Sequence, residues 1–100
     1  MLFTALLKVR EGSTSDERAV RRAQYAYPEG CRPVSKYWLQ TTDPSLPHVV
    51  ATYKADSAEA IMALVGDWDD HFHITVVPSM TAEQGLRAIE QMMQAGREQA

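Results

Sequence analysis

The chain has 100 residues, of which 45% are hydrophobic and 23% charged, and its formal net charge is −3. This length gives room for one domain, and this composition is typical of a globular protein rather than a disordered one. The acidic balance excludes a general electrostatic attraction to nucleic acid or to anionic membranes. The only cysteine, Cys31, excludes a disulfide or a thiolate-rich zinc site within one chain, which fits a reducing cytoplasm.

The apolar segment 1–7 has no basic leader and no small-residue cleavage site, and it continues into Lys8-Val9-Arg10. It is therefore interpreted as a strand rather than a signal peptide. No segment approaches the roughly 20 apolar residues that a membrane span requires. We expect a cytoplasmic protein.

Residue spacing predicts four strands and three helices. Strands are indicated by alternation of apolar side chains, and helices by apolar residues at helical spacing behind a capping residue. In chain order we expect a strand over 2–9, a helix over 14–27, a strand over 34–40, a strand over 48–54, a helix over 56–68, a strand over 71–77 and a helix from 81 to about 95. A polar tail over 96–100 is expected to fray, so that residues 1–95 form the single domain.

This order predicts an α+β, ferredoxin-like β-α-β-β-α-β fold with one antiparallel sheet, helices on one face and an extra C-terminal helix. The second helix is expected to bury a stripe that ends at Trp68. The first helix is expected to keep its apolar residues on one side and its three arginines on the opposite, exposed side. The apolar residues are Ala19, Val20, Ala23 and Tyr27, and the arginines are Arg18, Arg21 and Arg22.

Several short segments resemble a family of short bacterial proteins of unknown function. They are Met1-Leu2-Phe3, Pro28-Glu29-Gly30, Tyr37-Trp38, Trp68-Asp69-Asp70 and Val76-Val77-Pro78. That family is placed in the dimeric α/β-barrel superfamily, with the muconolactone isomerases and the antibiotic-biosynthesis-type monooxygenases. The resemblance implies a homodimer whose two sheets close a barrel, and it transfers no catalytic residue.

Alternation also divides the strands into two faces. The more apolar set is expected to meet the helices and consists of Phe3, Ala5, Leu7, Tyr37, Leu39, Val49, Ala51, Phe72, Ile74 and Val76. The other set is too apolar for water and too polar for an ordinary core, which suits the interior of a two-sheet barrel. Within that set, the residues expected to line a small-molecule cleft are Thr4, Leu6, Trp38, His48, Thr52, His71 and Thr75.

His73 is the candidate acid or base of this cleft, beside Trp38, because an unperturbed histidine titrates near working pH. Its alternative role is a structural hydrogen bond to a neighbouring threonine. A metal site using His71 and His73, with His48 and a nearby aspartate, lacks a known ligand spacing, so no metal and no cofactor is predicted. Cys31 is interpreted as an unreactive thiol.

Two functions therefore remain open. One is a small-molecule binding protein, or a cofactor-free enzyme of isomerase or oxygenase type, that uses the barrel cleft. The other is a non-enzymatic dimerisation or partner-binding module whose barrel is filled by its own side chains. Cavity size separates them, since ligand pockets generally hold about 300 Å³ or more.

Overall fold

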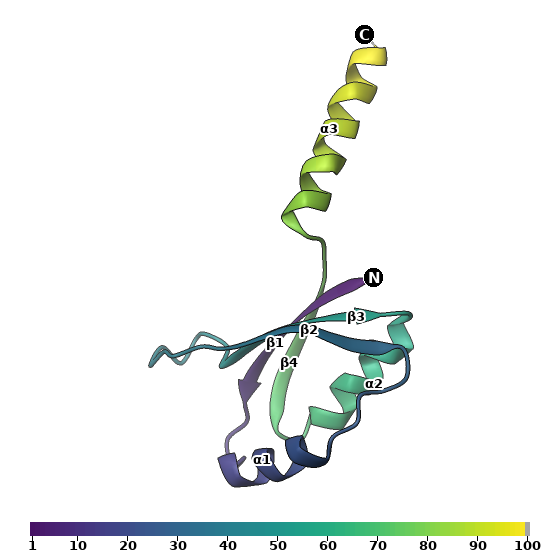
Figure 1. The fold of residues 1–100 in the computed structure, drawn as a ribbon. Helices are drawn as coiled ribbons and strands as arrows, with labels where there is room; N and C mark the ends of the chain where they lie inside the picture. Colours follow the sequence, from purple (N-terminus) through teal and green to yellow (C-terminus); the bar gives the residue numbers. More distant parts are fainter. Residues whose placement is uncertain (100) are drawn as a thin grey trace.

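The computed structural model describes residues 1–99, and their side chains as far as residue 98. Four strands form one antiparallel sheet in the order β2-β3-β1-β4, with α1 and α2 on one face (Figure 1). The elements are β1 (Leu2–Val9), α1 (Ser15–Gln24), β2 (Cys31–Trp38), β3 (Val49–Ala55), α2 (Ala58–Trp68), β4 (Phe72–Ser79) and α3 (Ala82–Gln99). The predicted ferredoxin-like α+β fold with an extra C-terminal helix is thus confirmed.

The core lies between the sheet and α2. In β1 every second side chain is buried, and Ala60, Ile61 and Leu64 of α2 cover these residues. Trp68, at the end of α2, is partly buried against the same cluster, as its place in the apolar stripe predicts. The strand face away from the helices contains Leu2, Thr4, Leu6 and Lys8 of β1, Val50, Thr52 and Lys54 of β3, and His73, Thr75 and Val77 of β4. We call this the open face.

An irregularity in β2 reverses the predicted faces of its second half. The pairing with β3 shifts between Pro33 and Ser35, so that Val34 is an extra residue. Before the shift Cys31 lies opposite Ala55, and after it Trp38 lies opposite Val49. A bulge adds one residue, and one residue turns every later side chain to the other face. The prediction that Trp38 lies on the open face is therefore wrong.

The same bulge corrects the positions of the two residues before Trp38. Lys36 lies opposite the buried Ala51 and faces the helices, whereas Tyr37 lies opposite Val50 and faces away from them. The strand also begins at Cys31, three residues before the predicted start. Proline is tolerated in a strand mainly at edges and bulges, and β2 is an edge strand that holds Pro33 next to its bulge.

Helix α1 packs on the domain with the side opposite to the one predicted. Val20 is 62% exposed and α1 has no buried residue. The arginines instead extend beneath the helix toward aromatic rings of the core. The long arginine stem can cover apolar surface while its guanidinium lies on a ring, which small alanine and valine side chains cannot do from this distance.

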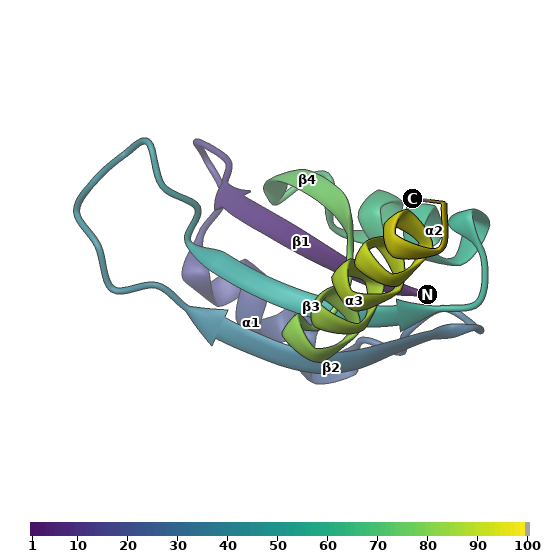
Figure 2. The ribbon, with the colours of Figure 1, turned by 90° about the horizontal axis from the view of Figure 1, so that it is seen from above.

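Helix α3 projects from the opposite side of the sheet, away from α1 and α2 (Figures 1 and 2). Thr81 and Gln84 cap it reciprocally, with the Thr81 backbone N–H donating to Gln84 Oε1 at 2.9 Å and the Gln84 N–H donating to Thr81 Oγ1 at 3.1 Å. The helix continues through Gly96 to Gln99, and the fraying expected from residue 96 stays a prediction; Ala100 lies outside the described residues.

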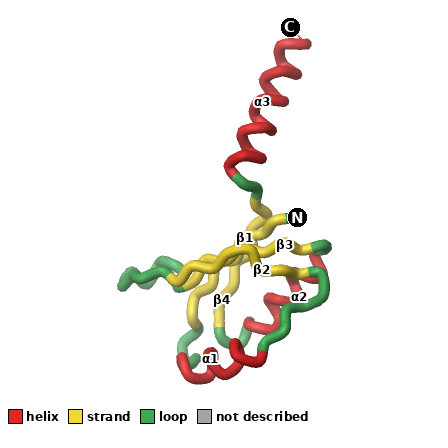
Figure 3. Tube along the Cα trace, viewed as in Figure 1, coloured by secondary structure: helices red, strands yellow, loops and turns green. Residues whose placement is uncertain are grey.

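Only a short loop joins α3 to β4, and no other element runs beside the helix (Figure 3). Its large apolar side chains are therefore exposed, among them Leu86, Ile89, Met92 and Met93. Spacing of three and four residues places Leu86, Ile89 and Met93 on one side of the helix. This amphipathic helix has no covering element within the described part of the chain.

Candidate functional site

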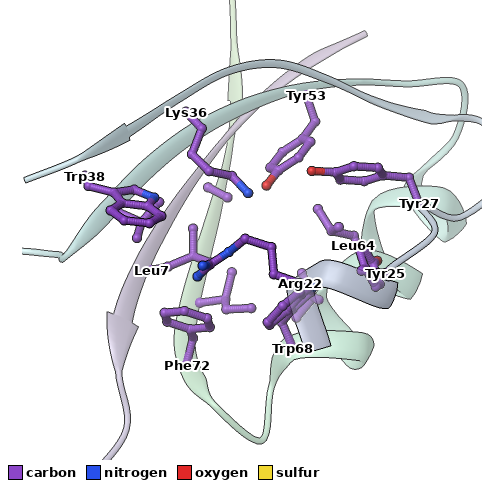
Figure 4. Close-up of a pocket in the computed structure, with 14 residues that line it drawn as sticks. Leu7, Arg22, Tyr25, Tyr27, Lys36, Trp38, Tyr53, Leu64, Trp68 and Phe72 are labelled. Carbon is purple, nitrogen blue, oxygen red and sulfur yellow. The ribbon is translucent and has the colours of Figure 1, made fainter. Parts of the chain in front are cut away.

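A pocket of about 80 Å³ lies between the sheet, α1 and α2, on the face opposite to the predicted cleft (Figure 4). We call it the α1 pocket. Its walls are aromatic and aliphatic, with two cationic side chains among them. The lining residues are Ala5, Leu7, Arg22, Tyr25, Tyr27, Lys36, Trp38, Val49, Tyr53, Leu64, Val65, Trp68, Phe72 and Ile74.

The pocket exists because α1 stands away from the sheet. Thr14 caps the helix by accepting a hydrogen bond from the Glu17 backbone N–H, and the chain then returns through Tyr25 and Tyr27 to the sheet. Since α1 buries none of its own residues, it leaves space above the strands that bulkier helix side chains would otherwise fill. The bulge in β2 turns Lys36 and Trp38 toward this space.

Aromatic rings form a connected wall around the pocket. Tyr25 packs edge-on against Tyr27 and against Trp68, with ring centroids 5.2 Å apart in each case. Trp68 continues to Phe72 at 6.0 Å, and Tyr27 continues to Tyr53 at 6.1 Å. These distances lie in the range of favourable aromatic pairs, so the wall is held by ring packing from β3, α2, β4 and the α1–β2 loop.

One tyrosine of this wall is also fixed by a hydrogen bond. The Tyr25 hydroxyl donates to Asp67 Oδ2 at 2.8 Å, which ties the end of α1 to the end of α2. Burial, together with this carboxylate, raises the pKa of Tyr25 well above its usual value. Tyr25 therefore stays protonated at neutral pH and acts as a structural donor.

The three arginines of α1 differ in their partners. Arg18 lies over the ring of Phe72 at 5.9 Å, and its guanidinium donates to Ser13. Arg21 lies over Trp68 at 5.8 Å and forms an ion pair with Asp70, which lowers the pKa of that carboxyl. Arg21 thus pairs with a nearby acid while its side chain also covers the core.

Arg22 has a different environment. Its guanidinium carbon lies 5.0 Å from the centre of the Trp38 ring, and no carboxylate within the described residues lies within 4.0 Å of it. Lys36 is likewise without an acidic partner there, and burial together with the Arg22 charge lowers the pKa of Lys36. The α1 pocket thus carries two positive charges that no protein carboxylate offsets.

The open face brings together part of the predicted cleft. Thr4 lies opposite Thr52 on one side and Val77 on the other, and Leu6 lies opposite Thr75. Two pairs of hydroxyl groups already form hydrogen bonds with each other, Thr4 with Ser79 and Ser35 with Thr52, with the oxygens 2.6 Å apart in each pair. Trp38 does not join this group, because it lies on the other face and on the strand at the far edge from β4.

The three histidines do not come together as predicted. His73 is exposed on the open face, with Lys8 opposite it and Arg10 Nη1 3.4 Å from its Nε2. His71 precedes β4 and is buried on the side of α1, where its Nδ1 lies 2.7 Å from Ser13 Oγ, so it does not line the open face. His48 precedes β3 at the same end of the sheet as His73, with β1 between them, and its Nδ1 accepts a hydrogen bond from the Val9 backbone N–H.

Two further expectations concern metal and thiol chemistry. Within residues 1–98 no three side chains of histidine, cysteine, aspartate and glutamate converge in a way that could hold a metal ion. Cys31 is buried at the start of β2, and burial raises the pKa of its thiol. A buried thiol with a raised pKa is a poor nucleophile, in agreement with the sequence interpretation.

The sequence prediction missed the α1 pocket, and one signal could have indicated part of it. Pro33 inside a strand is itself evidence for an edge or a bulge, and a bulge there turns Lys36 and Trp38 toward the helices. No comparable local signal shows that α1 packs with Arg22 inward. That orientation depends on contacts with residues distant in the sequence.

The chain matches the family model described as a domain of unknown function, DUF3303, over residues 1–93. It belongs to the DUF3303 family. The predicted membership of a family of unknown function is thereby confirmed at this level, and the match includes every strand, both helices of the sheet face and most of α3. No curated protein and no solved structure matches the chain. Among the helices that the structure describes, none has the length and apolar content to cross a membrane.

Proposed function

We propose that this DUF3303 protein is a small-molecule binding protein that acts as a homodimer, in the reducing environment of the cytoplasm. The observation that carries the binding proposal is the α1 pocket, an aromatic recess with a few polar groups directed into it. Ligand sites are mostly of this kind, an apolar wall with a small number of placed polar groups. The homodimer is the arrangement implied by the dimeric α/β-barrel superfamily.

Support for the homodimer comes from two uncovered apolar surfaces. The open face alternates threonines with Leu6, Val50 and Val77, and α3 exposes its own apolar side. An uncovered patch of this kind on a small domain is typical of an interface. A second chain laid on the open face would cover it and would enclose the cleft lined by Thr4, Leu6, Thr52 and Thr75.

A matched pair of substitutions tests where a ligand binds. Trp38 and Tyr37 are adjacent in β2, are 59% and 64% exposed, and face opposite sides of the sheet. In a thermal-shift screen of small aromatic acids, amides and alcohols, we expect at least one compound to stabilise the wild type. Trp38→Ala should abolish that shift, while Tyr37→Ala should retain it.

The reverse result, with the shift lost in Tyr37→Ala and kept in Trp38→Ala, would move the ligand to the open-face cleft. His73→Asn then tests the enzymatic form of the proposal, in which His73 transfers a proton in an isomerase- or oxygenase-like reaction. Loss of the shift in that variant, at unchanged stability, would support this role. No stabilising compound at all would contradict the binding proposal.

The second candidate is a dimerisation module without a ligand. It is favoured by the two satisfied hydroxyl pairs on the open face, which need no further partner. The enclosed volume of about 80 Å³ is also well below the roughly 300 Å³ of a typical ligand pocket. A homodimer that binds nothing in the screen would favour this candidate.

A further inference from the structure

We infer that the ligand of the α1 pocket is a small organic monocarboxylate with a flat apolar body, whose carboxylate lies between Arg22 and Lys36. This inference rests on the proposed binding function and names its chemical class. Three observations carry it: two positive charges without acidic partners, a hydroxyl in the pocket without a protein partner, and the shape and composition of the walls.

The first observation is the convergence of like charges. Arg22 reaches the pocket from the last turn of α1 and Lys36 reaches it from β2, so two separate elements direct a cation at one space (Figure 4). The neighbouring Arg21 has Asp70 as a partner, whereas within residues 1–98 neither Arg22 nor Lys36 has a carboxylate within 4.0 Å. Two nearby positive charges repel each other, and an anion between them would remove that repulsion.

The second observation is the hydroxyl of Tyr53. The residue is only 4% exposed, and its hydroxyl group points toward Lys36 and Tyr27 in the pocket (Figure 4). The hydroxyl forms no hydrogen bond within the described residues, and since no fully buried side-chain nitrogen or oxygen among them lacks a partner, the hydroxyl oxygen itself keeps some exposure. Burial of the residue raises its pKa, so it remains a donor at neutral pH. A hydroxyl that lines the pocket and has no protein partner is available to donate to a ligand oxygen.

The third observation is the wall. Trp68, Phe72 and Leu64 form an apolar floor, while Trp38 lies under the Arg22 guanidinium at 5.0 Å. The pocket volume of about 80 Å³ is well below the roughly 300 Å³ of a typical ligand pocket, so only part of a ligand fits within it. The apolar end of the ligand would occupy this space, and its carboxylate would lie at the mouth near the exposed ends of Arg22 and Lys36.

The planar carboxylate matches these donors better than a neutral group does. A guanidinium presents paired N–H donors that suit two carboxylate oxygens, and an ammonium adds a point charge. Charged hydrogen bonds are about twice as strong as neutral ones. A carboxylate should therefore bind more tightly than an amide of the same shape.

Benzoate and benzamide test this with isothermal titration calorimetry, because they share a shape and differ in charge. We expect wild-type protein to bind benzoate at least tenfold more tightly than benzamide. Arg22→Gln and Lys36→Met should each remove that preference and leave benzamide binding unchanged. Lys54→Met, which removes the same charge from the open face of β3, should keep the preference.

Tyr53→Phe provides an additional variant that should fold as the wild type does, because its hydroxyl has no partner to lose among the described residues. It should weaken benzoate binding several-fold. Equal binding of benzoate and benzamide by the wild type would overturn the inference and leave the small-molecule proposal standing. Binding of neither compound would overturn the inference, and the binding proposal for this pocket would then depend on the wider thermal-shift screen.

Discussion

Trp68 connects the core to the α1 pocket, and its replacement by alanine should destabilise the protein strongly. The indole packs against Tyr25 at 5.2 Å and Phe72 at 6.0 Å, and Arg21 lies over it at 5.8 Å. Full truncation of a buried aromatic side chain costs about 3–5 kcal/mol. Because Trp68 is only partly buried, we expect a loss near the lower end, about 3 kcal/mol, in the free energy of unfolding.

Urea denaturation followed by circular dichroism measures this loss directly. For a domain of this size, about 3 kcal/mol corresponds to a melting temperature lowered by roughly 12–24 °C. The matched control is Trp38→Ala, because Trp38 is the only other tryptophan of the chain and is 59% exposed. Its truncation should cost less than about 1 kcal/mol. An unchanged stability of Trp68→Ala, or equal losses in both variants, would refute the assigned packing of α2 and of β2.

Three other outcomes follow from the structure. Light scattering on a size-exclusion column should report about twice the 11.2 kDa mass of one chain at micromolar concentration, and a clean monomer would contradict the proposed cover of the open face. Cys31 should react with a thiol reagent at neutral pH only after unfolding, since it is 3% exposed and burial raises its pKa; rapid native labelling would contradict this. Because Arg21 lowers the pKa of Asp70, their interaction should stabilise the fold above about pH 4 and lose this effect as the pH falls through the lowered pKa. Asp70→Asn should then reduce the acid dependence of stability, and an identical acid dependence would count against the pair.

The elements that local sequence determines were predicted well. The alternation of β1 depends only on neighbouring residues, and the buried set Phe3, Ala5 and Leu7 is the predicted one. The cap formed by Thr81 and Gln84 is equally local, and its two hydrogen bonds are present. In such segments, side-chain spacing and caps are sufficient to define the element.

The candidate site was predicted less well, because each error concerns how an element meets its neighbours. One extra residue at Val34 reversed the face of Trp38, and the alternation of side chains along the sequence cannot by itself reveal a bulge. His73 and Trp38 also lie on opposite edge strands, with β3 and β1 between them. Adjacent strands are about 4.8 Å apart, so three steps across the sheet separate the two by well over 10 Å even without the bulge.

The orientation of α1 has a different cause. A rule that places apolar residues inward favours Val20, but this helix lies too far from the sheet for short side chains to reach the core. Arginine side chains span that distance and lie on the aromatic rings. Distance between layers is a tertiary property, so the pocket that it creates is not encoded in the helical pattern alone.

The binding of a small molecule in the α1 pocket is tested most directly by the two indole N–H signals of a ¹⁵N-labelled sample. Trp38 and Trp68 are the only tryptophans of the chain, and both line this pocket. With the compound that stabilises the protein most, we expect both indole signals to shift while the amides of His73 and Thr75 on the open face stay in place. Shifts at His73 and Thr75 with unmoved indole signals would contradict the assignment of the site.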